Sequence, residues 1–186
     1  MARIPLNVES TGWLGRVAAG VSRRRYGAVL EPLAAAAHQP WVLWANIRNE
    51  LVVERRWRSL DPGLRDLAVV ASAARLGCAW CMDFGYWKAH SDGTLTESKL
   101  EAIPEWRDSD LFTERERQVL AYAEAMTDTP IGVTDEQVQQ LRQSLGDARL
   151  VELTAYIALE SQRSRFNSAL GLSGQGFRDR CELLPA

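Results

Sequence analysis

The sequence has few cysteines and no long apolar run. Three cysteines in 186 residues are too few for the disulfide framework of a small secreted protein. No stretch approaches the roughly 18 uninterrupted apolar residues that a membrane-spanning helix needs. The first residues, MARIPLNVESTGWLG, lack the apolar core of a secretory signal. We therefore expect a cytoplasmic protein with no membrane partner.

The sequence also lacks an excess of either charge. It has 22 basic and 24 acidic residues, which gives a net charge of -2. A nucleic-acid-binding protein normally carries a basic footprint. Arginines cluster at 23–25 and 55–58, but such short runs are more often solvated faces. We expect no nucleic-acid partner.

Sustained strand alternation is absent, whereas apolar residues recur at helical spacing over most of the chain. We predict an all-α fold, a single-domain helical bundle of six or seven helices. The bundle is expected to cover residues 29–175. Residues 1–28, with weak periodicity, are interpreted as an N-terminal arm, and residues 176–186 as a C-terminal tail.

Local signals place the helix ends. Asp61 and Pro62 mark a helix start, and Gly77 a helix end. Residues 106–110 are interpreted as a polar connection between helices. Capping boxes are predicted at three pairs: Thr94 with Glu97, Thr113 with Glu116, and Thr134 with Gln137.

The most informative chemical feature is the segment Cys78-Ala79-Trp80-Cys81. Two thiols three residues apart share one helix face. They can form and open a disulfide, or bind a metal together, and a helix start lowers a thiol pKa. A zinc site needs about four ligands, and the chain offers only distant His38, His90 and Cys181 as additions. We expect no metal and no cofactor.

The segment LRDLAVVASAARLGCAWC resembles the carboxymuconolactone decarboxylase superfamily, and within it the AhpD-like alkylhydroperoxidase branch. The later segment LVELTAYIALESQRSRFNSALGL is similar to the closing helix of that superfamily, so the resemblance covers about residues 35–175. It implies an all-helical homo-oligomer that reduces a small hydroperoxide by cysteine chemistry. A thiol or protein electron donor, not named by the sequence, would recycle it.

The resemblance also implies residue roles. Cys81 would meet the peroxide and Cys78 would resolve the oxidised form. Asp66 stands where the family has a glutamate, and Gly85 stands where the family usually has a histidine. A proton relay or site lining must therefore come from elsewhere. The candidates are Asp83, Tyr86, His90, Trp80 and Tyr156.

Two other functions remain open at this point. The chain can be a lyase of the decarboxylase type, although proton transfer to a carbanion-like intermediate needs a well-placed acid. It can also be a non-catalytic binding or assembly module, because fold does not fix function. Asp66 itself can be only a favourable acid in the first turn of its helix. Seven tryptophans favour a homo-oligomer in each case.

Overall fold

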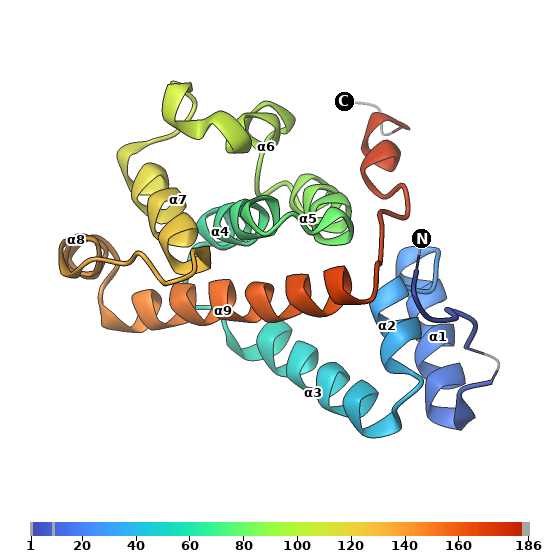
Figure 1. Cartoon of the computed structure of the whole chain (residues 1–186). Coiled ribbons are helices and arrows are strands. Elements are labelled where there is room, and N and C mark those ends of the chain that lie inside the picture. Colours follow the sequence, from blue (N-terminus) through green and yellow to red (C-terminus); the bar gives the residue numbers. More distant parts are fainter. Residues whose placement is uncertain (1, 9, 184–186) are drawn as a thin grey trace. The chain divides into compact units, whose positions relative to one another are not determined.

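A computed structural model describes residues 2–8 and 10–183, and these residues form helices and connections without any strand (Figure 1). The all-α prediction is confirmed. The number of helices is higher than the six or seven predicted, because short helices fill segments that the sequence pattern leaves ambiguous. The elements are α1 (Gly12–Tyr26), α2 (Glu31–Ala36), α3 (Pro40–Arg56), α4 (Pro62–Arg75), α5 (Ala79–Ser91), α6 (Glu97–Ala102), the 3-10 helix η1 (Ile103–Asp108), α7 (Glu114–Thr127), α8 (Asp135–Leu145), α9 (Asp147–Ala169) and the 3-10 helix η2 (Arg178–Leu183).

The chain divides into two compact units. The first comprises residues 1–57 and 169–173, and the second residues 58–168 and 174–186. In the first unit, α1 and α3 each pack on the alanine-rich α2. The segment expected to be an arm thus contains a helix, and Arg3 anchors its start by donating from its backbone N to the Leu170 carbonyl at 2.9 Å. The predicted domain boundaries themselves stay predictions.

The second unit is organised around α4, which packs against both α5 and α7. Asp61 caps α4 by accepting the Leu64 N–H at 3.1 Å, and Pro62 follows at a position where no N–H is needed. The buried face of α4 consists largely of alanines and leucine, so neighbouring helices approach closely. Gly77 adopts φ +65°, which ends the helix as predicted because glycine tolerates the left-handed region.

One predicted capping box is wrong. Thr96, not Thr94, precedes α6 and accepts the Lys99 N–H, while Thr94 donates to Asp66. The error arises because a threonine two residues earlier has the same local chemistry, and only tertiary contacts select between them. The capping boxes of α7 and α8 are confirmed.

The expected polar connection at 106–110 is also only partly right. Residues 103–108 form η1, and Trp106 is buried with its indole N–H donated to Glu124 at 2.9 Å. The polar residues around Trp106 led to the prediction of a polar connection. This one aromatic side chain is buried, and its hydrogen bond to Glu124 attaches the connection to α7.

The segment after Gly174 packs on α5. Phe177 is fully buried and its ring lies 5.2 Å from that of Phe84 and 5.3 Å from that of Trp87. The predicted tail therefore carries a large apolar anchor, followed by η2. Within the described part of the chain, no helix is long and apolar enough to cross a membrane.

Candidate active site

Cys78 and Cys81 form a disulfide at the start of α5. Cys78 is the N-cap residue, and its Sγ accepts the Cys81 backbone N–H at 3.2 Å. Such an N–H belongs to the unpaired donors of a helix start and stabilises negative charge on the sulfur. Cys78 is 1% exposed and Cys81 6%, so Cys81 is the more accessible of two buried sulfurs.

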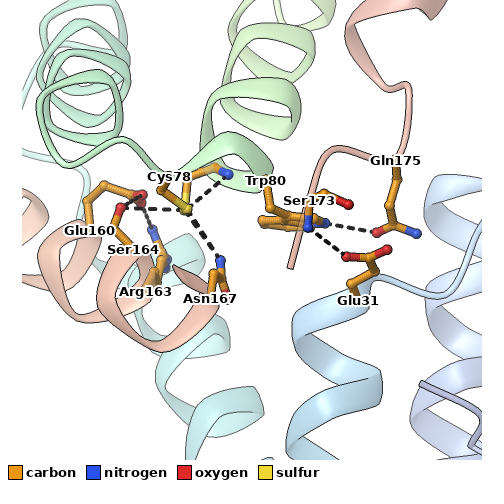
Figure 2. Close-up of a disulfide and its surroundings, with 10 residues drawn as sticks. Glu31, Cys78, Trp80, Glu160, Arg163, Ser164, Asn167, Ser173 and Gln175 are labelled. Carbon is orange, nitrogen blue, oxygen red and sulfur yellow. Dashed lines mark hydrogen bonds and ion pairs between the residues drawn. A yellow bond between two sulfur atoms is a disulfide. The ribbon is translucent and has the colours of Figure 1, made fainter. Parts of the chain in front are cut away.

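Three polar side chains of α9 lie on the same face, and two of them, Ser164 and Asn167, contact the sulfurs of this disulfide. Glu160, Ser164 and Asn167 are spaced by four and three residues, which places them one above another on a helix. Each is at most 3% exposed. Figure 2 shows all three side chains turned toward the sulfur atoms. The site thus combines the N-terminus of α5 with one face of α9.

The polar side chains of α9 lie closer to the sulfur of Cys81 than to that of Cys78. Asn167 Nδ2 lies 3.3 Å from Cys81 Sγ and 3.9 Å from Cys78 Sγ. Ser164 Oγ lies 3.5 Å from Cys81 Sγ and 3.1 Å from Glu160 Oε1. A donor amide and a hydroxyl next to sulfur can hold a thiolate, because hydrogen bonds to the charged form favour that form.

Glu160 is a buried carboxylate with a cationic neighbour. Its Oε2 lies 3.4 Å from Nη1 of Arg163, which is itself partly buried. Burial of an unpaired charge is costly, and this ion pair and the Ser164 hydroxyl both reduce that cost. Oε1 accepts from the Ser164 hydroxyl at 3.1 Å, and that hydroxyl lies 3.5 Å from Cys81 Sγ.

Asp66 lies in a separate network. Its Oδ1 accepts from Arg65 Nε at 2.6 Å, and its Oδ2 accepts from Arg65 Nη2 at 2.8 Å and from Thr94 Oγ1 at 2.6 Å. Both carboxylate oxygens therefore have donors. The hydrogen bonds found in the described residues connect Asp66 with these partners and not with either cysteine.

Asp83 and Trp80 hold the C-terminal segment against α5. The Asp83 carboxylate accepts the backbone N–H groups of Gln175 at 2.6 Å and Arg178 at 2.8 Å. Trp80 donates its indole N–H to Gln175 Oε1 at 2.9 Å and stacks on Phe84 at 5.0 Å. Structural contacts therefore occupy the polar atoms of both residues.

The remaining candidates are two tyrosines and a histidine. Burial raises the pKa of Tyr86 above its usual value, and the nearby Arg178 offsets this only in part. Burial likewise raises the pKa of Tyr156, against the opposing effect of Arg65. Both phenols are thus protonated at neutral pH. His90 has a buried Nδ1 without a hydrogen-bond partner among the described residues. The roles predicted for these residues stay predictions.

Within the described residues, no three His, Cys, Asp or Glu side chains are grouped to hold a metal ion. The disulfide occupies both sulfurs that the sequence offers as a half-site. What the arrangement offers instead is a pair of sulfurs that can be reduced, beside a carboxylate, a hydroxyl and an amide.

Comparison with known proteins decides the family. Residues 42–125 match the carboxymuconolactone decarboxylase family. The chain is also 34% identical over 176 residues to the uncharacterized protein YnjA of Escherichia coli K12, covering 95% of this chain and 92% of YnjA. The chain belongs to the carboxymuconolactone decarboxylase family. The resemblance inferred from the sequence is thereby confirmed.

Solved structures share the fold. ATU0492 of Agrobacterium tumefaciens, a protein of unknown function proposed to be the antioxidant defence protein AhpD, has a TM-score of 0.64 at 25% identity, over 75% of this chain and 94% of that chain. A complex of the debrominase Bmp8 with 2,3,4-tribromopyrrole has a TM-score of 0.80 at 19% identity, over 98% and 96%. The fold is thus shared with a debrominase as well as with a protein proposed to be AhpD.

Sequence reasoning missed Glu160 and Ser164 as site residues. The available signal was the spacing of Glu160, Ser164 and Asn167, which puts three polar residues on one stripe of a helix that is otherwise apolar on that side. The closing helix alone does not say that this stripe faces the two cysteines, which lie 83 to 89 residues before Ser164 and Asn167 in the chain.

Proposed function

We propose that this member of the family is a thiol-dependent peroxidase that cycles Cys78 and Cys81 between dithiol and disulfide. The observation that carries the proposal is the disulfide at the start of α5, with the polar face of α9 directed at Cys81. The likeness to ATU0492 supports the same chemistry. A hydroperoxide is the proposed substrate, and the proposal includes a cytoplasmic, homo-oligomeric protein.

The reaction has two steps that balance. The Cys81 thiolate attacks the outer oxygen of the hydroperoxide, the O–O bond breaks, and a sulfenic acid forms while the alkoxide takes up a proton and leaves as an alcohol. Cys78 sulfur then attacks Cys81 sulfur, which closes the disulfide and releases water. A dithiol donor supplies two electrons and two protons that restore both thiols.

Two features of the geometry support attack by Cys81. Its Sγ has the closer contact with Asn167 Nδ2 and the contact with Ser164 Oγ, which together stabilise a thiolate. Cys78 is more deeply buried and lies at the N-cap, where the helix N–H of Cys81 favours its thiolate as a leaving group during reduction of the disulfide.

The test is dithiothreitol-dependent consumption of cumene hydroperoxide and hydrogen peroxide. We expect turnover by the wild type, no turnover by Cys81→Ser, and retained turnover by Cys181→Ser. The last variant is the matched control, because Cys181 is a buried cysteine outside the disulfide. A wild type whose thiols are shown to be reduced and which consumes neither hydroperoxide would refute the proposal.

A further inference from the structure

A chain of two polar contacts connects Cys81 with a buried carboxylate. Ser164 Oγ is 3.5 Å from Cys81 Sγ and 3.1 Å from Glu160 Oε1. A hydroxyl has one proton to donate and two lone pairs to accept with. Ser164 can therefore accept a proton from a reduced Cys81 while it donates its own to Glu160.

We propose that Glu160 is the proton acceptor for Cys81 and that it acts through the hydroxyl of Ser164. This inference rests on the proposed peroxidase and names the base that it needs. The Cys81 S–H proton moves to Ser164 Oγ as the Ser164 proton moves to Glu160. The products are a thiolate and a neutral carboxylic acid, so no net charge is added to a buried site.

The same route returns the proton. When the thiolate attacks the hydroperoxide and the O–O bond breaks, the departing alkoxide needs one proton. Glu160 supplies it back through Ser164, so the proton that began on Cys81 ends on the alcohol. Glu160 is again a carboxylate, and the first step needs no proton from solvent. A relay of this kind suits a site in which both sulfurs are nearly inaccessible to water.

Asp66 is placed less well for this role. The resemblance assigns it the acid position, but its carboxylate already accepts three hydrogen bonds from Arg65 and Thr94. Glu160, by contrast, has its Oε1 3.1 Å from Ser164 Oγ, the hydroxyl that lies 3.5 Å from Cys81 Sγ. The proton acceptor in this proposal is therefore Glu160 on α9, and not Asp66 on α4.

The charged and titratable groups around the relay come from three helices. Arg163 on α9 pairs with Glu160, and Cys78, the N-cap of α5, is bonded to Cys81 in the oxidised state. Arg65 and Asp66 on α4 interact with Tyr156, one turn of α9 before Glu160. The Arg163 guanidinium favours the charged form of Glu160, while the Asn167 amide stabilises the thiolate that results.

The test measures the Cys81 thiolate directly, without any hydroperoxide. The full chain carrying Cys78→Ser and Cys181→Ser is reduced, and Cys81 is alkylated with iodoacetamide across a pH range. In this background, Glu160→Gln and Ser164→Ala should each lower the rate near about pH 7 by about tenfold, the effect of raising the Cys81 pKa by about one unit. The rate should recover near about pH 9, above the ordinary thiol pKa of about 8.5.

The matched control is Ser161→Ala. Ser161 is also on α9, and its hydroxyl donates to the Ile157 carbonyl at 2.9 Å. Its replacement should leave the alkylation profile unchanged. If Glu160→Gln fails to unfold cooperatively in circular dichroism, Ser164→Ala decides alone, because that variant keeps the carboxylate.

Three results would overturn the relay. A carboxylate that acts only by its charge hinders the thiolate, so faster alkylation in Glu160→Gln would refute proton transfer. An unchanged profile in Ser164→Ala would do the same. A larger loss in Asp66→Asn than in Glu160→Gln would return the role to Asp66. Because alkylation requires no hydroperoxide, the relay and the peroxidase proposal fail independently.

Discussion

Replacement of Asp83 by alanine should release the C-terminal segment from α5 without changing the thiol chemistry. The Asp83 carboxylate accepts two backbone N–H groups, those of Gln175 and Arg178, at 2.6 and 2.8 Å. Gly174 permits this approach, because a Cβ at that position would lie only 3.2 Å from the Asp83 Cγ. The alanine variant leaves both N–H groups without their acceptor.

The structure gives the size of this effect. A hydrogen bond to a charged group contributes about 1.5–3 kcal/mol, and two are lost. Arg178 is exposed, so water can replace its acceptor, whereas Gln175 is partly buried. We therefore expect the free energy of unfolding to fall by about 2–3 kcal/mol. At about 2–4 °C per kcal/mol for a chain of this size, the melting temperature should fall by about 4–12 °C.

Urea unfolding followed by tryptophan fluorescence measures this change. Asp83→Asn is the graded control, because its amide keeps one acceptor oxygen, and its loss should lie between those of the wild type and Asp83→Ala. Iodoacetamide alkylation of Cys81 below the unfolding transition should be unaffected in both variants. A stability loss below about 0.5 kcal/mol, the size of an ordinary surface substitution, would contradict the reasoning. Slower alkylation at unchanged stability would instead assign Asp83 to the proton relay predicted from sequence.

Two further predictions concern acid stability and assembly. Burial acts to raise the pKa of Glu116, but hydrogen bonds from Lys99 and Thr113 outweigh it and lower the pKa below its usual value. The stability that the Glu116 carboxylate contributes is therefore present above the unfolded pKa and is lost as pH falls through the folded pKa. In urea unfolding, Lys99→Met should lose less stability than the wild type between about pH 7 and about pH 3. An equal loss in both proteins would contradict this role of the Lys99–Glu116 pair. For assembly, α3 exposes Trp41, at 75%, together with Trp44, Leu51 and Val52, and α1 exposes Trp13, at 71%; large exposed apolar patches mark interaction surfaces. Sedimentation at micromolar concentration should show an oligomer that Trp13→Ser and Trp41→Ser weaken, and a wild-type monomer would refute this.

The helix ends depend on local chemistry, and most of them could be read from the sequence. Asp61 caps α4, Thr113 and Thr134 cap α7 and α8, and Gly77 ends α4. In each case a side chain within three residues satisfies the backbone, or glycine supplies a conformation that other residues avoid. The exception is the start of α6. Either Thr94 or Thr96 could cap it on local chemistry, and the tertiary hydrogen bond of Thr94 to Asp66 leaves Thr96 as the cap.

The helix α1 escaped prediction for a different reason. Its buried residues are small, namely Gly15, Ala18, Ala19 and Ser22, while large apolar side chains such as Trp13 are exposed. A periodicity search expects large apolar residues to face the core. Here the close packing of small residues determines the buried face, so the usual pattern is reversed.

The sequence by itself determined an all-α fold, the family and the redox-capable pair Cys78 and Cys81, because helix periodicity, caps and a three-residue spacing are local properties. The tertiary structure alone decided which groups surround those sulfurs. It placed Ser164 beside Cys81 and Glu160 beside Ser164, and it paired Asp66 with Arg65. The physical reason is that a carboxylate acts on a thiol only over a few ångströms, and the packing of α9, α5 and α4 sets that distance, which spacing along the chain cannot.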